Sequence, residues 1–284
     1  MSVLDLLIEP FRHGFMVKAM LVGGFVCAVC AALSCFIVLK GWSLVGDAIS
    51  HAVLPGIVLA HLLGLPMALG AVASGILCVQ AAGGVAATSR VKPDAALGIL
   101  FTGFLALGMV LVTAFPADID FAHILFGNLL GITTENLVQA LLLGALTLAT
   151  VFLKRRDLVL FCFDPVQAQV IGLSPARLEA LLLLLVAATA VASLQAVGLA
   201  LILAMLITPG CVGLLLARRF DSALAIAMGS AVFSAFAGTV ASFHLDGATG
   251  PCIVLVQAMQ FAIAFAVSPR GGLRPRSISR AGAP

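Results

Sequence analysis

The chain has 284 residues, of which 62% are hydrophobic and only 10% are charged, and its formal net charge is +3. An ordinary soluble domain carries about 25% charged residues, so this composition excludes that class and requires a lipid bilayer to solvate the apolar surplus. The Lys and Arg residues form no basic stripe, and no aromatic RNA-binding motif accompanies them, which argues against a nucleic-acid partner. The composition predicts an all-α integral membrane protein.

The N-terminal segment does not resemble a cleaved signal peptide. Residues 1–10 carry Asp5 and Glu9 and no Lys or Arg, whereas a signal peptide begins with a basic segment. We expect residues 1–15 to form an interfacial segment that leads into the first span.

Long apolar segments predict a polytopic bundle of eight or nine membrane spans, because a crossing helix needs about 20 apolar residues. The stretch 178–217 either crosses twice, dividing near Gly198, or crosses once and adds a broken or re-entrant piece. The predicted spans are 17–39, 43–63, 66–88, 95–115, 136–153, 178–196, 198–217, 223–243 and 251–268.

The distribution of basic residues predicts the orientation. With the N-terminus outside and nine spans, every Lys and Arg except Arg12 and Lys18 falls on the cytoplasmic side, as the positive-inside rule requires. Residues 1–269 then form a single transmembrane domain with a cytoplasmic loop at 154–176. The basic run 270–284, rich in Gly, Pro and Ser, is predicted to be a disordered cytoplasmic tail.

Asp47 and His51 are the most informative polar residues, because they lie inside the second predicted span. Their i, i+4 spacing puts both side chains on one face of a helix. A carboxylate and an imidazole form a partial ligand set for a divalent transition metal. The alternative, a polar pair that only hydrogen-bonds between helices, stays open on spacing alone. Gly46 and Gly56 permit close helix approach, and Pro55 frees backbone carbonyls and bends the helix.

The other histidines and the seven cysteines are weaker candidates. His13 and His61 are expected at the membrane interface, and His123 and His244 on outer loops that also carry Asp118, Asp120 and Asp246. These loops attract cations, contact a delivery protein or are simply solvated. The cysteines are scattered through apolar stretches and are interpreted as small packing residues.

The inner segment 154–176 contains a predicted cytoplasmic helix over 164–172. Asp164 is a favourable N-cap, and Pro165 suits the first helical position. Gly172 is a favourable stop. A two-turn helix here suits docking to a partner protein; the alternative is a surface helix without a partner.

Motifs that carry catalysis are missing from the chain. No G-x-x-x-x-G-K-[ST] run or H-E-x-x-H pair occurs, and tyrosine is absent, so the chain contains neither a P-loop ATPase nor a zinc protease of that type. We predict that the chain is not an enzyme.

Residues 39–56 (LKGWSLVGDAISHAVLPG) resemble the signature of the membrane permease subunit of ABC transporters that import manganese, iron or zinc. Further matching segments occur in the same order, and the resemblance covers about residues 5–273. The residues of this signature are most similar to those of the manganese/iron branch of that family. The further segments are PDAALG (93–98), LFGNLLG (125–131), LQAVG (194–198), MLITPG (205–210) and LDGATGP (245–251).

The resemblance implies a complete transport complex in the bacterial inner membrane. It implies a second permease copy or a sister permease, two cytoplasmic ATPase subunits and an extracytoplasmic metal-binding protein, with no permanently bound cofactor. It also implies that Asp47 and His51 contact the transported metal ion. The ATPase-coupling position matches Asp164, Pro165, Gln167, Ala168 and Gly172.

Two alternatives remain at this point. A permease for a metal chelate, such as a siderophore or corrin, would share the ATPases but would need a wide path without a ligand pair. A secondary metal transporter would need no ATPase and should contain inverted repeats, and the sequence has no convincing one. An oxygen and a nitrogen ligand without nearby thiolates favour Mn²⁺, Fe²⁺ or Zn²⁺ over Cu⁺.

Overall fold

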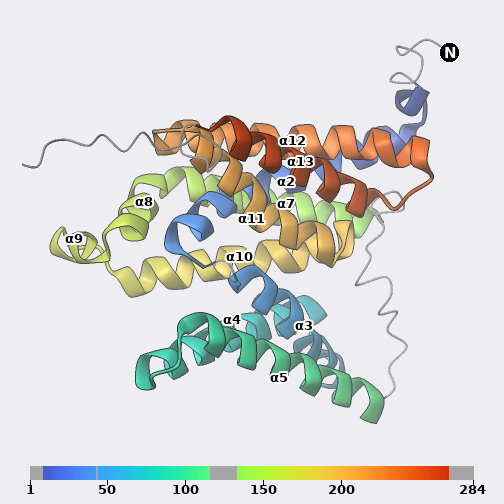
Figure 1. Cartoon of the computed structure of the whole chain (residues 1–284). Helices are drawn as coiled ribbons and strands as arrows, with labels where there is room; N and C mark the ends of the chain where they lie inside the picture. Colours follow the sequence, from blue (N-terminus) through green and yellow to red (C-terminus); the bar gives the residue numbers. More distant parts are fainter. Residues whose placement is uncertain (1–8, 43, 116–132, 269–284) are drawn as a thin grey trace, which may run out of the picture.

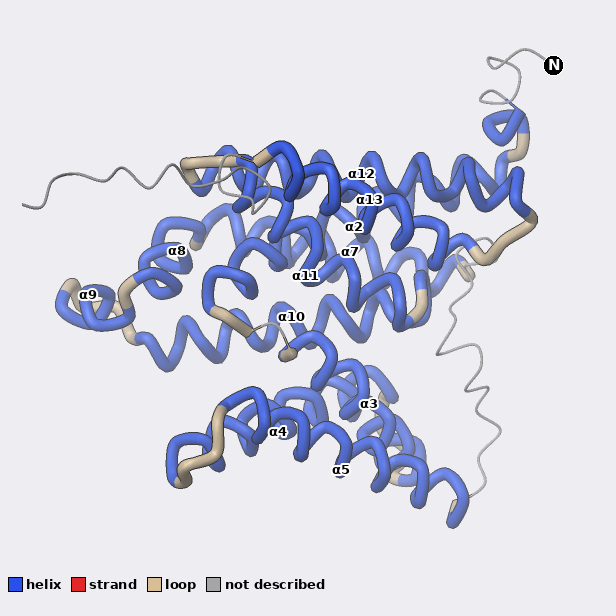
Figure 2. The backbone as a smooth tube through the Cα atoms, in the orientation of Figure 1, coloured by secondary structure: helices blue, strands red, loops and turns tan. Residues whose placement is uncertain are grey.

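The computed structural model describes residues 9–42, 44–115 and 133–268, and every regular element within these ranges is a helix. Figure 2 shows these helices joined by short loops. The predicted all-α class is therefore confirmed. The helices are η1 (Glu9–Arg12), α2 (Gly14–Lys40), α3 (Val45–Leu62), α4 (Met67–Thr88), α5 (Pro93–Ala114), α7 (Thr134–Leu153), α8 (Arg155–Phe163), α9 (Pro165–Val170), α10 (Pro175–Val197), α11 (Leu199–Leu216), α12 (Phe220–Leu245) and α13 (Thr249–Val267).

Eight of the described helices are long and apolar enough to cross a membrane: α2, α3, α4, α5, α7, α10, α12 and α13. α11, apolar over Leu201–Leu216, adds a ninth apolar helix. The stretch 178–217 forms two helices, α10 and α11, and the crossing of the membrane by α11 stays a prediction. They divide at Gly198, whose φ of +83° is readily adopted only by glycine.

Helix α2 lies at the centre of the larger part of the bundle. It is apolar all round and almost wholly buried, as expected of a helix surrounded by other helices. It contacts α7, α11 and α12. Cys27, Cys30 and Cys35 lie in this helix, and all three are buried and unpaired, which agrees with their interpretation as packing residues.

Helices α3, α4 and α5 form a second, smaller group below α10 in Figure 1. They contact one another extensively and meet the rest of the bundle mainly through α10 and α11. We call this three-helix group the α3–α5 unit. It carries both residues of the predicted metal pair.

One end of the bundle gathers the ends of several helices and much of the basic charge. Lys40 Nζ lies 3.8 Å from the centre of the Phe161 ring, and Arg155 Nη1 lies 3.2 Å from Asp221 Oδ1. The Ser268 hydroxyl donates to the Leu215 carbonyl at 2.8 Å. We call this the basic end. By the positive-inside rule it faces the cytoplasm, which stays a prediction, as does the outer position of the N-terminus.

The inner segment contains two helices where the sequence predicted one. α8 precedes the expected helix and returns toward α2, where Cys162 Sγ approaches the Phe36 carbonyl at 3.9 Å. α9 runs only over Pro165–Val170, shorter than the predicted 164–172. It ends early because Gly172, at φ +88°, reverses the chain and lets Leu173 N–H donate to the Ala168 carbonyl. The tail 270–284 and the outer segment 116–132 lie outside the described residues.

Candidate metal site

A tight turn at the basic end places the candidate site. α2 ends at Gly41, whose φ is +73°, and the Gly41 and Trp42 amides donate to the Val38 and Ile37 carbonyls. This left-handed glycine closure turns the chain into α3. Asp47 then lies in the first turn of α3, where the positive end of the helix dipole stabilises a carboxylate.

Asp47 and His51 contact each other, as their spacing predicted. His51 Nε2 lies 3.2 Å from Asp47 Oδ1. The exposed fractions of the two side chains are 26% for His51 and 30% for Asp47, whereas their neighbours Ala48, Ile49 and Ala52 are fully buried. The pair therefore lies on the partly exposed side of a helical turn whose other side is buried.

Helix α5 contributes a contact that the sequence did not reveal. The Phe101 ring stacks on the His51 imidazole, with ring centres 5.6 Å apart and planes inclined by 20°. Phe101 is half-buried, and its α5 helix packs along α3. No spacing rule links residue 101 to residues 47 and 51, because the contact depends on how two helices pair in space.

Helix α3, which carries the site, crosses α4 at very close range. A Cβ atom added to Gly56 would collide with the Gly70 carbonyl, and one added to Gly70 would collide with the Gly56 carbonyl. This confirms the predicted close approach at Gly56. Gly46 packs less tightly, against the Leu206 side chain.

Pro55 lies inside α3 and has no N–H to offer the carbonyl one turn before it. α3 nevertheless remains a single helix from Val45 to Leu62. Nearby, the Ser74 hydroxyl of α4 donates to the Ala52 carbonyl at 2.5 Å. A side chain from the neighbouring helix thus supports the backbone next to the proline.

The pair supplies only two ligands within one chain. Among the described residues, no group of three or more His, Cys, Asp and Glu side chains is arranged to hold a metal ion. His61 is exposed in the last turn of α3, and His13 and His244 lie near Phe243 at the end opposite the basic end. His123, Asp118 and Asp120 lie outside the described residues.

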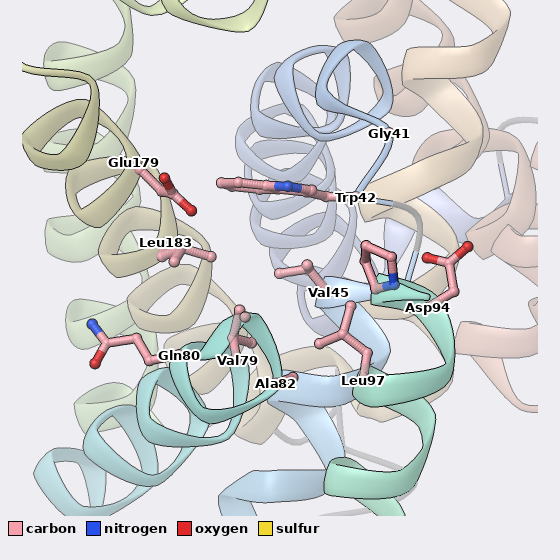
Figure 3. Close-up of a pocket in the computed structure, with 12 residues that line it drawn as sticks. Gly41, Trp42, Val45, Val79, Gln80, Ala82, Asp94, Leu97, Glu179 and Leu183 are labelled. Carbon is pink, nitrogen blue, oxygen red and sulfur yellow. The ribbon is translucent and has the colours of Figure 1, made fainter. Parts of the chain in front are cut away.

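A cavity of about 360 Å³ opens beside the turn from α2 to α3 (Figure 3). Trp42, the only tryptophan of the chain, extends across it toward Glu179 of α10. Asp94 stands at its rim, and apolar side chains including Val45 and Leu183 line its interior. Asp47 and His51 are not among its lining residues, so the cavity, which lies between the α3–α5 unit and α10, is separate from the pair.

The predicted coupling helix has the expected cap. Asp164 Oδ1 accepts hydrogen bonds from the Val166 and Gln167 amides at 3.0 and 2.9 Å, and Pro165 occupies the first helical position. Ala168 is buried, whereas Val166 and Val170 are exposed by 72% and 81%. Figure 1 shows α9 projecting at the end of the bundle, and its exposed valines give it an apolar surface.

Comparison with known proteins identifies relatives over nearly the whole chain. Residues 12–268 match the family model "ABC 3 transport family". The chain is 52% identical over 260 residues to the chelated iron transport system membrane protein YfeD of Yersinia pestis, covering 92% of this chain and 88% of that one. It is 48% identical over 267 residues to the manganese transport system membrane protein MntB of Synechocystis, covering 94% and 87%.

A solved structure has the same fold. The chain superposes on PsaBC from Streptococcus pneumoniae, determined in complex with a Fab, with a TM-score of 0.84 and 33% sequence identity. The match covers 94% of this chain and 97% of that one. The arrangement of helices described above is therefore shared with that solved structure.

Proposed function

Because the chain belongs to the ABC 3 transport family, we propose that it is the membrane permease of an ATP-driven importer of divalent transition-metal ions. Mn²⁺ and Fe²⁺ are the favoured substrates, and Zn²⁺ is a further candidate. The observation that carries this proposal is the contact between Asp47 and His51 on a half-open face of a membrane helix. Ionisable groups in such a position are costly and are functional candidates by default.

The geometry of the pair suits a cation bound by both side chains. Carboxylate oxygens and imidazole nitrogens bind transition metals at about 2.1 Å. For ligand atoms 3.2 Å apart, this distance corresponds to an angle of about 100° at the metal. That angle lies between the octahedral and tetrahedral values, so the pair supports either geometry.

Two ligands leave the coordination shell of the ion incomplete, since such ions take four to six. We propose that a second permease copy or a sister permease brings an equivalent pair, and that water fills the remaining positions. The exposed apolar side chains of α5, including Ile99 and Val110, offer a surface for a neighbour in the membrane. An extracytoplasmic metal-binding protein delivers the ion to this shared path.

ATP hydrolysis belongs to separate subunits in this proposal, because the chain has no P-loop. α9 is the element that fits a cytoplasmic ATPase. It lies beyond the bundle, and its cap at Asp164 holds it rigid while Val166 and Val170 remain exposed. Movement of an ATPase against α9 would reach the spans through α8 and α10, which flank it in the chain.

The alternatives differ in how well they fit. A secondary transporter without an ATPase conflicts with membership of an ABC transporter family. A permease for a metal chelate remains a second candidate, because one relative is named for chelated iron. The partly open ionisable pair favours a bare ion, since a chelate already fills the coordination shell of its metal.

Uptake of radioactive Mn²⁺, Fe²⁺ and Zn²⁺ by cells that carry the complete transporter tests the proposal. Asp47→Ala should abolish uptake of the physiological ion while the amount of permease in the membrane stays normal. Thr102→Val is a suitable control, because the exposed Thr102 hydroxyl bonds only to a carbonyl of its own helix, that of Gly98, in the described contacts. Unchanged uptake of all three ions by Asp47→Ala would overturn the proposal.

A further inference from the structure

We infer that Phe101 is a positioning residue for the metal ligand His51, and this inference rests on the function proposed above. The observation that points to it is the stacked contact between the two rings, which joins α5 to the pair on α3. Phe101 offers no ligand atom, so it would act only through His51.

The stacking geometry limits how the imidazole can turn. The two ring planes are inclined by only 20°, with centres 5.6 Å apart, a separation typical of interacting aromatic pairs. Rotation of the imidazole about its Cβ–Cγ bond would break this parallel arrangement. This torsion, χ2, has a broad range of accessible angles in an unconstrained histidine. The contact with the Phe101 ring restricts that range.

A fixed ring plane matters because an imidazole nitrogen binds a metal through a lone pair that lies in that plane. In the structure, Nε2 of His51 points toward Oδ1 of Asp47 at 3.2 Å. The plane that Phe101 favours is thus the plane in which one ion can contact both ligand atoms. Ligands held in advance in the bound geometry bind more tightly, because less conformational freedom is lost on binding.

Phe101 also differs from its neighbours in α5. Ile99, Leu107 and Met109 are largely exposed, whereas Phe101 is half-buried and packs against the core of the bundle. Its environment is therefore that of a residue held in place rather than of a side chain free to move in lipid. Because the Phe101 ring is fixed by this packing, it transmits the position of α5 to the imidazole.

The test measures metal uptake as a function of metal concentration in vesicles that contain the complete transporter. Phe101→Leu keeps an apolar side chain but removes the ring, and should raise the half-saturating concentration by about two- to tenfold, the range expected for one aromatic pair. The maximal rate per folded permease should stay unchanged. Phe101→Tyr retains the stacked ring and should restore the wild-type concentration dependence.

Two controls make the result specific. Phe104→Leu removes an aromatic ring one turn further along the same helix and should leave the half-saturating concentration unchanged. Phe101→Met supplies a second ring-free variant if Phe101→Leu folds poorly, and it should show the same shift. An equal shift for Phe104→Leu, or no shift for the folded ring-free variants, would overturn the inference.

Asp47→Ala, measured in the same vesicles, separates failure of this inference from failure of the proposed function. If Asp47→Ala loses uptake and the ring-free variants behave as wild type, only the role of Phe101 is wrong. If Asp47→Ala transports normally, the proposed metal path is wrong, and the role of Phe101 is overturned with it.

Discussion

Among the polar groups of the described residues, the Asp47–His51 pair and a second cluster differ in almost every physical respect. Asp47 and His51 are ionisable and about a quarter to a third exposed. The other cluster joins α12 to α13 through neutral side chains. In it the fully buried Gln257 amide donates to Ser230 at 3.0 Å and accepts from Ser234, while Ser230 donates to Gln260 at 2.7 Å.

The difference shows how polar groups that stabilise the fold of a membrane protein can be told apart from polar groups that can bind a ligand. The α12–α13 cluster satisfies its own hydrogen bonds, and no buried side-chain N or O atom among the described residues lacks a partner. Such neutral interhelical bonds contribute about 0.6–2 kcal/mol each. The Asp47–His51 pair has unused ligand capacity and an open side, so it can accept something from outside the chain.

Neutralising the ionisable pair should produce the largest effect. Asp47→Asn keeps the shape of the side chain but removes its charge, so binding of a divalent ion loses its anionic ligand. Loss of outer-shell partners alone weakens metal sites by about 10- to 100-fold, and loss of a ligand should do at least as much. Metal-dependent uptake at low concentration checks this, and uptake within twofold of wild type would contradict it.

Introducing an ionisable residue into the α12–α13 cluster should lower the stability of the fold and leave metal binding intact. Gln257→Glu places an ionisable group at the fully buried position of the α12–α13 cluster, where a charge costs roughly 2.5–3.5 kcal/mol on insertion scales. We expect a lower midpoint of thermal unfolding for the purified permease. The folded fraction should keep the wild-type metal concentration dependence. A variant as stable as wild type would remove the contrast between the two clusters.

A matched glycine pair tests how strongly the site helix depends on its close crossing. Gly56→Ala puts a methyl group against the Gly70 carbonyl, and such overpacking costs about 1–3 kcal/mol. Gly98→Ala adds the same atom in α5 where nothing lies within 4 Å. Thermal unfolding of both variants should show a loss for Gly56→Ala only, and equal midpoints would refute the crossing described here.

The smallest expected effect concerns α9. Asp164→Ala removes the acceptor for the Val166 and Gln167 amides, and loss of such a cap costs about 1 kcal/mol. The fraying is local, so we expect weaker metal-stimulated ATP hydrolysis by the assembled complex with normal metal binding. Asp164→Asn, which retains a capping oxygen, should behave as wild type. Equal loss in both variants would point to the charge instead of the cap.

Much of the fold followed from local sequence. The lengths of the apolar segments predicted the long helices. Gly198 marked the division of the stretch 178–217, and Asp164 with Pro165 marked the start of α9. The Asp47–His51 contact followed from helical spacing alone. These features depend on residues within a few positions of one another, where backbone geometry decides the outcome.

The remaining features depend on helix pairing, which spacing does not encode. The stacking of Phe101 on His51 and the cavity beside Trp42 join helices that are not consecutive in the chain. The Gln257 cluster joins the consecutive helices α12 and α13 through side chains 27 positions apart. α8 was missed because its nine residues, three charged and then six apolar, are too few to show a helical period, and no capping side chain marks its start. The orientation in the membrane stays a prediction from the basic residues.

Pulsed electron paramagnetic resonance of Mn²⁺ bound to the assembled transporter in lipid nanodiscs tests the central claim most directly. A nitrogen ligand couples its nuclear spin to the metal, so the account predicts a nitrogen signal that changes when histidine is labelled with ¹⁵N and disappears in His51→Gln. The same nitrogen signal in wild type and His51→Gln, or none in either, would contradict the claim that the transported ion contacts this imidazole.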